Sequence, residues 1–232
     1  YHNKRSYMES LTSEILASLP LFQGIGKNEL AQFSDSVPHS IVKYNKGQTI
    51  VSQDSPCRHL ILILQGTVGV STDADNKIYT LHERLHSPTA IQPEMLYGIS
   101  LRYTHSYTAQ TEVKALIIPK EGVVTMYSHF EVFRLNIINL LSTKIYRQHQ
   151  WFWHNHDAGT EKRIVHFIHS RCSYPAGEKI LEISMEQLGR QINEPRMKIS
   201  HSLNQMQKKG WLLLHRGKII VPALEKLILN VK

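Results

Sequence analysis

The sequence predicts an α+β protein with an N-terminal antiparallel β-roll of the jelly-roll kind, a long dimerisation helix and a C-terminal winged helix-turn-helix. Three stretches carry this prediction. Residues 37–118 show short strands separated by turns, residues 129–154 continue one helical pattern, and residues 183–221 read as two helices followed by a hairpin. A run of strands followed by a run of helices is typical of this fold class.

The composition is that of a chain that buries a core and does not enter a membrane. It has 232 residues, of which 41% are hydrophobic, and no run of about 18 apolar residues that would indicate a span. Cys57 and Cys172 lie far apart, which fits a reducing cytoplasm and gives neither a zinc site nor an iron–sulfur cluster. No signal peptide is apparent, and the true N-terminus stays open because residue 1 is Tyr.

Positive charge is concentrated in the last third of the chain. Residues 160–232 hold 13 Lys or Arg against 6 Asp or Glu, a net of +7 within the whole chain's +8. A basic C-terminal part beside a nearly neutral remainder is what a DNA-binding module attached to another domain would show. Basic charge alone also serves RNA, membranes or solubility.

The first half of the chain changes from helical to strand periodicity. Apolar residues recur at helical spacing over residues 8–36. Strands are then expected within residues 40–50, 60–64, 67–71, 78–81 and 107–118, with turns at Lys46-Gly47 and Gln65-Gly66. Many short strands joined by turns indicate an antiparallel barrel or sandwich.

The helix expected over residues 129–154 is longer than a small barrel can cover. Its length is about 39 Å at 1.5 Å per residue. Its surplus apolar face is expected to pack on the same helix of a second copy, although part of it packs on its own barrel. Residues 151–159 are expected to form the hinge that follows. The apolar stripe of this helix comprises Phe130, Phe133, Ile137, Leu140, Leu141 and Ile145.

The helix-turn-helix prediction rests on three local signals. Ser184 and Gln187 have the spacing of a capping box at the start of the first helix. Asn193 tolerates the left-handed backbone of a sharp turn, and Pro195 suits the beginning of the second helix. On that second helix the apolar residues Ile199, Leu203 and Met206 form one stripe, with polar residues opposite.

The polar front of the second helix suits the DNA major groove, and the hairpin that follows has a basic tip around Arg216-Gly217. An ordinary helical hairpin with a solvated charged face is the alternative, because this pattern is common by chance. The hairpin favours a winged helix. The candidate DNA-contacting residues are Ser184 and Gln187 on the first helix, Arg196, Met197, Lys198, Ser200 and His201 on the second, and His215, Arg216 and Lys218 on the hairpin.

The histidines of residues 149–156 do not indicate a metal site. His149, His154 and His156 lie close in sequence, and His154-Asn155-His156 has the letters of a nuclease motif, but no acidic ligands accompany them. With 14 histidines in the chain, chance proximity explains the cluster. We expect no metal and no cofactor. Haem stays open as a ligand, although no particular histidine is marked for it.

The order of these elements resembles the cyclic-AMP receptor / fumarate-nitrate reduction regulator (CRP/FNR) superfamily of bacterial transcription factors. The resemblance covers nearly the whole chain and makes the β-roll similar to a cyclic nucleotide-binding domain. It rests on Leu21-Phe22 with Glu29-Leu30, on Tyr44, Gly47, Gln48 and Ile50, on residues 60–64, Gly66 and Val68, on Thr108-Ala109 with residues 113–120, and above all on the ungapped residues 183–212.

The resemblance implies which residues would read DNA. Arg196 stands where the family's first base-reading Arg stands, whereas the usual Glu is Met197 and the later base-reading Arg is His201. Pro195 replaces the hydroxyl at the start of the recognition helix, and Lys198 replaces a phosphate-contacting Thr. Arg196 is therefore the contact expected to carry base recognition, and the preferred half-site should differ from that of the well-known receptor.

The resemblance also implies an effector site, from which this sequence departs. Cyclic-nucleotide binders hold ribose and phosphate with a Gly-Glu pair and a later Arg, but neither Gly nor Glu stands within residues 86–91, and Tyr107 replaces the Arg. An unpaired buried phosphate is costly, so tight cyclic-AMP binding is not expected. The candidate effector-pocket residues are Thr89, Ala90, Tyr107, Thr108 and Ala109.

The expected protein is a cytoplasmic, sequence-specific DNA-binding regulator of transcription that acts as a homodimer on a pseudo-palindromic operator. RNA polymerase is a further candidate partner, and no membrane partner is expected. Residues 1–128 would form the sensor part, 129–159 the dimerisation helix and hinge, and 160–232 the DNA-binding domain. Two other classes stay open: a sensor of cyclic nucleotides or other small molecules with a non-standard pocket, and a β-roll enzyme, which the absence of paired carboxylates disfavours. Effector, operator and direction of regulation stay open.

Overall fold

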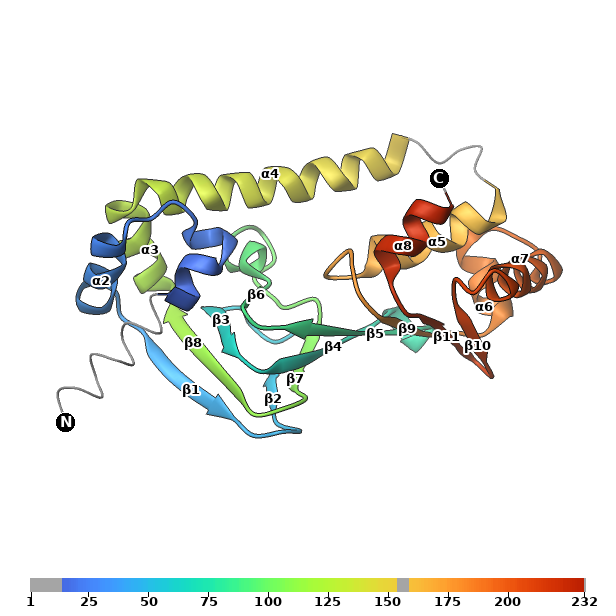
Figure 1. The fold of residues 1–232 in the computed structure, drawn as a ribbon, viewed down its shortest axis with the longest axis horizontal. Coiled ribbons are helices and arrows are strands. Elements are labelled where there is room, and N and C mark those ends of the chain that lie inside the picture. Colours follow the sequence, from blue (N-terminus) through green and yellow to red (C-terminus); the bar gives the residue numbers. More distant parts are fainter. Residues whose placement is uncertain (1–13, 154–158, 232) are drawn as a thin grey trace. The chain divides into compact units, whose positions relative to one another are not determined.

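The computed structural model describes residues 14–153 and 159–231 (Figure 1). Residues 8–13 of the expected N-terminal helix, and residues 154–158 of the expected hinge, lie outside this range. The chain forms two compact units: residues 1–68 with 86–146, and residues 69–85 with 147–232. The functional division at residues 128 and 159 remains a prediction, and each unit is described by itself.

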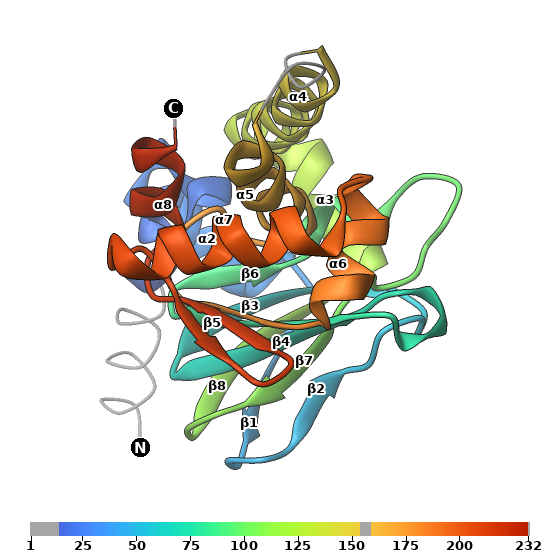
Figure 2. The ribbon, with the colours of Figure 1, turned by 90° about the vertical axis from the view of Figure 1, so that its right-hand side faces the viewer.

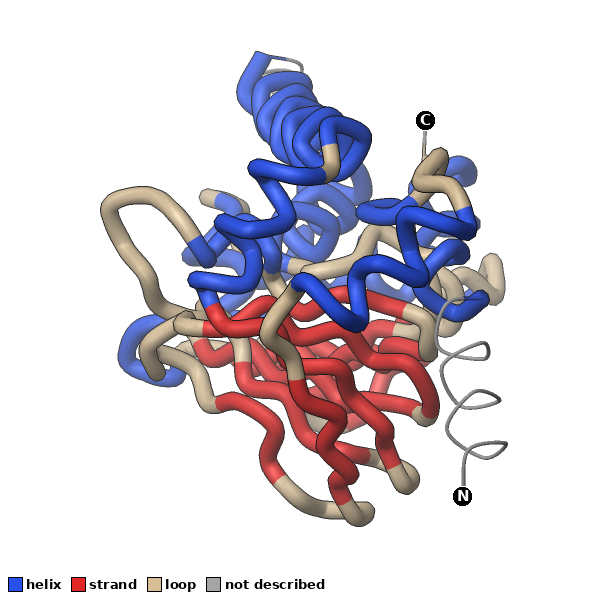
Figure 3. Tube along the Cα trace, turned by 90° about the vertical axis from the view of Figure 1, so that its left-hand side faces the viewer, coloured by secondary structure: helices blue, strands red, loops and turns tan. Residues whose placement is uncertain are grey.

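The first unit is built on antiparallel sheets, as the alternating sequence predicts (Figure 3). A four-stranded sheet has the order β1-β8-β3-β6, and β2 pairs with β7. The central strand β3 buries five consecutive apolar residues, 60–64, which explains why its sequence does not alternate. The strands are β1 (Ser40–Tyr44), β2 (Thr49–Val51), β3 (His59–Gln65), β6 (Thr89–Ile91), β7 (Ser106–Ala109) and β8 (Val113–Pro119).

Along the chain, helical segments come before the first strand and after the last strand of this unit. Residues 14–18 are helical and are followed by η1 (Pro20–Phe22) and α2 (Lys27–Ser36). A short 3-10 helix, η3 (Pro93–Leu96), follows β6. After β8 come α3 (Lys120–His129) and α4 (Glu131–Trp153), which Phe130 separates because its backbone is extended. The long helix therefore begins two residues later than the sequence pattern indicates.

The apolar stripe of α4 divides into two faces. Phe130, Phe133 and Ile137 are buried in the unit's own core, where Phe133 contacts Phe22 with ring centroids 5.6 Å apart. A second set points outward, with exposed fractions between 37% and 59%. It comprises Leu135, Ile138, Leu141 and Ile145, spaced three or four residues apart. The predicted stripe joined Leu141 and Ile145 to the buried face and left out Leu135 and Ile138.

The second unit combines a hairpin from the first half of the chain with the C-terminal helices. The hairpin consists of β4 (Thr67–Asp73), which enters this unit at Gly69, η2 (Asp75–Lys77) and β5 (Thr80–His86). The strand expected at 78–81 therefore begins later and runs further. The other elements are α5 (Thr160–Arg171), β9 (Lys179–Glu182), α6 (Met185–Ile192), α7 (Arg196–Lys208), β10 (Leu213–His215), β11 (Lys218–Val221) and α8 (Leu224–Asn230).

One sheet and one core hold the second unit together. The strand order is β10-β11-β9-β5-β4, and the β10–β11, β11–β9 and β5–β9 pairings are antiparallel. Above this sheet, α5, α6 and α7 bury a continuous apolar cluster that includes Ile164, Phe167, Leu188 and Leu203, each at most 2% exposed. The winged helix-turn-helix predicted from residues 183–221 lies within this unit (Figure 2).

Candidate nucleic-acid interface

The capping box at the start of α6 is formed as the sequence predicts. The backbone N–H of Gln187 donates to Ser184 Oγ at 3.1 Å, and the backbone N–H of Ser184 donates to Gln187 Oε1 at 3.1 Å. Ser184 is exposed and Gln187 is half-buried. Both side chains therefore already serve the helix end, and their role as DNA contacts would be secondary to this one.

The turn between α6 and α7 depends on two special backbone positions. Asn193 adopts the left-handed conformation, with φ of 54°. At Gly189 the chain passes so closely that a Cβ atom would lie 2.5 Å from the carbonyl oxygen of Glu194. The N–H of Glu194 in turn donates to the Gly189 carbonyl at 2.9 Å. Asn193 was predicted from the sequence, whereas the need for glycine at 189 was not, because it arises from a contact five residues away.

The helix α7 separates an apolar back from a polar front. Ile199, Leu203 and Met206 are completely buried in the unit's core. On the opposite face Arg196 and His201 are exposed, and Met197 is 79% exposed. The exposed front is the surface that the sequence predicted for the major groove.

Two predicted contact residues of α7 already have partners within the protein. Ser200 is half-buried and its carbonyl accepts a hydrogen bond from Asn204 Nδ2 at 2.7 Å. Lys198 Nζ lies 3.5 Å from Glu194 Oε2. The first turn of α7 has no acidic residue and its N-cap makes no side-chain hydrogen bond, so its end remains suited to a phosphate.

The wing is the β10–β11 hairpin, whose tip is the turn Arg216-Gly217. Gly217 has φ of +70°, which permits the tight turn, and His215 pairs with Lys218 across it. The side chains of His215 and Arg216 are exposed. The Ile183 N–H donates to the Gly217 carbonyl at 3.0 Å and thus ties the tip to the end of β9.

Lys218 differs from the other two wing residues because it has an ionic partner. Its Nζ lies 3.0 Å from Glu182 Oε1, and His82 Nε2 lies 3.7 Å from the other carboxylate oxygen. The hydrogen bond from Lys218 lowers the pKa of Glu182 below its usual value, with His82 adding to the effect. Lys218 must therefore leave or share this carboxylate in order to contact a phosphate.

The candidate effector residues lie on two strands of the first unit that belong to different sheets. Thr89 and Ala90 are half-buried on β6 and pair with Ile63 and Leu62 of β3. On β7, Tyr107 and Ala109 are each 1% exposed and Thr108 pairs with Thr49 of β2. The Tyr107 ring thus fills interior space at the position where the resemblance would place an arginine.

An ion pair that the sequence did not suggest lies next to this region. Glu94 of η3 is mostly buried, and its Oε1 lies 2.5 Å from Lys144 Nζ of α4. Just before it, the carboxamide of Gln92 holds Thr104: Nε2 donates to Thr104 Oγ1, and Oε1 accepts from the Thr104 N–H at 3.0 Å. The segment after β6 is therefore fixed by the protein's own side chains. Spacing could not have found these pairs, which join residues 12 and 50 positions apart.

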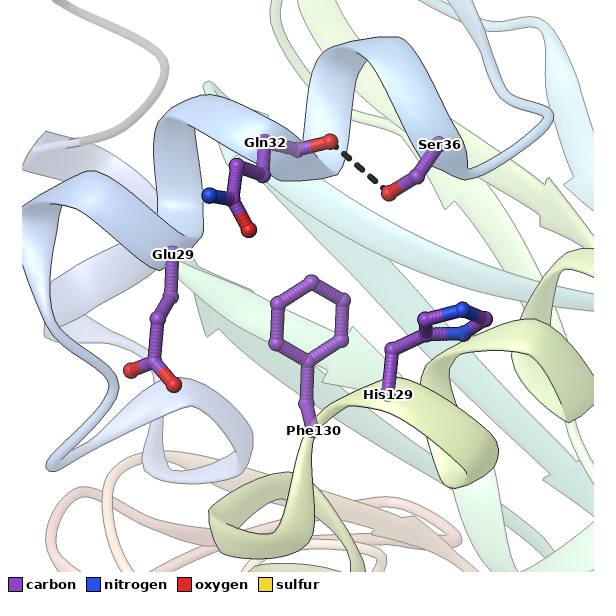
Figure 4. A pocket seen from close by; sticks show the side chains of 5 residues that line it. All are labelled: Glu29, Gln32, Ser36, His129 and Phe130. Atoms are coloured by element: carbon purple, nitrogen blue, oxygen red, sulfur yellow. Dashed lines mark hydrogen bonds between the residues drawn. The ribbon is translucent and has the colours of Figure 1, made fainter.

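A cavity of about 360 Å³ opens elsewhere in the first unit, between α2 and the α3–α4 junction (Figure 4). None of the five predicted effector residues lines it. One polar group of its wall already has a partner within the protein, because Ser36 Oγ donates a hydrogen bond to the Gln32 carbonyl at 2.8 Å. The lining residues are Glu29, Gln32, Ser36, His129 and Phe130.

One known protein family matches part of this chain. Residues 41–130 match the family described as "Cyclic nucleotide-binding domain". No curated protein sequence matches the chain.

The CRP/FNR fold covers most of the chain. The catabolite activator protein of Thermus thermophilus superposes with a TM-score of 0.52 at 16% identity, covering 92% of this chain and 100% of that one. The sensor domain of the transcriptional regulator DNR from Pseudomonas aeruginosa gives 0.53 at 14%, covering 62% and 94%. CprK complexed with OCPA gives 0.50 at 15%, covering 86% and 91%. The resemblance inferred from the sequence is confirmed.

Within residues 14–153 and 159–231, no three His, Cys, Asp or Glu side chains are grouped so as to hold a metal ion. The described helices include none with the length and apolar character needed to cross a bilayer. Of the histidine cluster considered in the sequence, His154 and His156 lie outside the described residues.

Proposed function

We propose that this protein is a sequence-specific DNA-binding regulator of transcription that acts as a homodimer. The observation that carries the proposal is the division of α7 into a buried back and an exposed front. Arg196, Met197 and His201 face solvent while Ile199, Leu203 and Met206 anchor the helix. A helix held in this way can lie in a major groove without disturbing its own core.

Within this interface the residues divide into two roles. Arg196 can donate two hydrogen bonds to guanine O6 and N7, and Met197 offers only apolar contact, for example to a thymine methyl group. His215 and Arg216 at the wing tip would contact phosphates, with Lys198 and Lys218 joining them after leaving their glutamates. Ser184, Gln187 and Ser200 remain candidates whose side chains or carbonyls already have protein partners.

The exposed face of α4 supports dimerisation. An apolar strip on this face is formed by Leu135, Ile138, Leu141 and Ile145, at spacings of three, three and four residues. A contiguous exposed apolar surface of this kind marks an interaction site. A second copy covers it with the same four residues under two-fold symmetry. Two recognition helices would then enter successive major grooves about 34 Å apart.

The β-roll is proposed to act as a sensor domain that does not bind cyclic AMP tightly. Tyr107 is buried at the expected arginine position and offers no positive charge to a phosphate. Titration calorimetry with cyclic AMP and cyclic GMP separates this proposal from a cyclic-nucleotide sensor. Any effector would act by shifting the equilibrium between conformations of different DNA affinity.

The decisive experiment is selection of bound sequences from a pool of random duplexes with the full chain. We expect enrichment of a pseudo-palindrome whose half-sites are centred about one helical turn apart. The affinity for that sequence should fall steeply with salt. If no sequence is enriched over the starting pool at any salt concentration, the protein is not a sequence-specific regulator.

A further inference from the structure

The hairpin of residues 69–85 belongs to the winged-helix unit although it is distant in sequence. Its strand β5 pairs with β9, and Leu81 lies opposite Leu181 while Glu83 lies opposite Lys179. Leu81 is completely buried in the cluster formed by the helices of this unit. The core behind α7 therefore takes one of its residues from the first half of the chain.

A second contact set fixes the turn end of the hairpin. Tyr79 packs against Phe167 of α5 with ring centroids 5.2 Å apart. Arg171 Nε donates to the Tyr79 hydroxyl at 2.9 Å, and the guanidinium carbon lies 3.8 Å from the centre of the Phe167 ring. These contacts are half-buried, so they orient the hairpin on α5 without any buried net charge.

The contact that holds the hairpin to β9 most strongly is an ion pair that is completely buried. Glu83 Oε2 lies 3.1 Å from Lys179 Nζ, and both side chains have zero exposure. Each of the two groups also forms hydrogen bonds with the backbone nearby. Glu83 accepts hydrogen bonds from the N–H groups of Ser173 and Tyr174 at 2.7 and 3.3 Å, and Lys179 donates to the Ala176 carbonyl at 2.7 Å.

Such a pair makes β9 depend on the hairpin. Removing either partner leaves the other charge buried without compensation, which is far more unfavourable than losing an exposed pair. The wing in turn depends on β9, because β9 pairs with β11 and the Ile183 N–H donates a hydrogen bond to the Gly217 carbonyl. The hairpin thereby supports the strand on which the wing is built.

We propose that Glu83 is a positioning residue for the wing: its buried pair with Lys179 fastens the β4–β5 hairpin to β9 and fixes where Arg216 points. Residues 160–232 alone would then lack the strand β5 that pairs with β9, part of their core and the counter-charge of Lys179. The effect on β9 stands on the structure of this unit, whereas the effect on DNA rests on the proposed function. The two are tested separately.

The first test measures amide hydrogen exchange of the full chain without DNA. Glu83→Gln is expected to speed exchange in β9 and β11 by at least about tenfold and to leave the β1-β8-β3-β6 sheet unchanged. The matched control is Glu178→Gln, which removes the exposed pair at 3.9 Å between Arg84 of β5 and the residue just before β9, and should change neither region. Equal protection of β9 in Glu83→Gln and wild type would overturn the proposal.

A double variant distinguishes the ion pair from general damage to packing. Glu83→Gln/Lys179→Met leaves no buried charge, so it should recover most of the protection lost in Glu83→Gln. If the single variant fails to fold, hydrogen exchange of this double variant is compared directly with that of the wild type. If the double variant exchanges amide hydrogens in β9 and β11 as fast as the single variant, or is also unfolded, the ion pair does not hold the hairpin to β9.

The second test asks whether Glu83 acts on DNA through the wing. Arg216→Ala is introduced into wild type and into Glu83→Gln, and affinity is measured on the selected operator. If Glu83 positions the wing, Arg216→Ala should weaken binding several-fold in wild type and by much less in Glu83→Gln. Equal losses in both backgrounds would overturn the positioning role. Absence of DNA binding by wild type would refute the proposed function and leave the exchange result valid.

Discussion

Glu194 Oε2 lies 3.5 Å from Lys198 Nζ at the start of α7, and the same carboxylate lies 3.2 Å from Arg163 Nη1 of α5. Glu194 is only 10% exposed at its side chain, while that of Lys198 is 66% exposed. The carboxylate thus holds the turn onto α5 and also offsets one positive charge on the face that we propose contacts DNA. The Glu194 carboxylate therefore stabilises the fold, whereas the proposed DNA contact of Lys198 would be stronger without it.

Replacing Glu194 by Gln should strengthen DNA binding while weakening the fold. Without the carboxylate, Lys198 is available to a phosphate, so the salt slope on any duplex should steepen by about one unit. Loss of the partly buried pair with Arg163 should lower the free energy of unfolding by about 1–3 kcal/mol. Fluorescence titration at several salt concentrations and urea unfolding measure the two effects. The matched control is Glu186→Gln, whose pair with Arg190 is exposed on α6.

Arg196→Ala should cost about 1–3 kcal/mol on the selected operator and relax the preference at one base pair. The arginine is exposed at the first turn of α7, so its removal leaves the core unchanged. Gel-shift titrations on the operator and on random duplex make the comparison. An equal loss on both would identify Arg196 as a phosphate contact only.

Lys218→Ala should weaken binding to all duplexes alike and flatten the salt slope by about one unit. Because Lys218 is paired with Glu182, its loss should matter less than that of Arg216, which is exposed at the wing tip. Filter binding over a range of salt concentrations ranks the two variants. A loss confined to one sequence would contradict the phosphate role.

Ile138→Glu should convert the dimer to monomer, because it places a charge in the middle of the exposed strip of α4. Sedimentation equilibrium measures the change. Val124→Glu on α3 is the matched control, since Val124 is 51% exposed but lies outside the strip. Unchanged association of Ile138→Glu would mean that α4 is not the dimer interface.

The stability of the fold should decrease as the pH falls from about 6.5 to about 4. Burial, followed by the positive charges of His169 and Arg171, lowers the pKa of His166 from 6.5 to about 4. In this window the unfolded chain binds a proton that the folded chain does not, so acid favours unfolding. His166→Gln should flatten the urea-unfolding profile over this range, whereas the exposed His201→Gln should not.

The sequence was sufficient for features that depend on neighbours along the chain. The capping box of Ser184, the left-handed Asn193 and the buried stripe of Ile199, Leu203 and Met206 are confirmed, because spacing of three and four residues determines them. The strand regions and the turn at Gln65-Gly66 follow from alternation and turn residues in the same way.

Features that depend on distant neighbours were beyond the sequence. The partners of Glu83, Lys218 and Glu94 lie 96, 36 and 50 positions away, and no local pattern marks them. The predicted stripe of α4 mixed residues of the two faces and omitted Leu135 and Ile138, because buried and exposed apolar residues have similar spacing. Of the candidate contacts, Lys198 and Lys218 are paired, which charge counting alone does not reveal.

The hairpin that ends at His86 is synthesised about 90 residues before its partner strand β9, which begins at Lys179. At ribosomal rates of roughly 5–20 residues per second, the edge of β5 stays open for some 5–20 seconds. An open strand edge is a template for pairing with other chains. The Arg84 and His82 side chains on that edge supply charge and polarity that disfavour such encounters until the last third of the protein has left the ribosome.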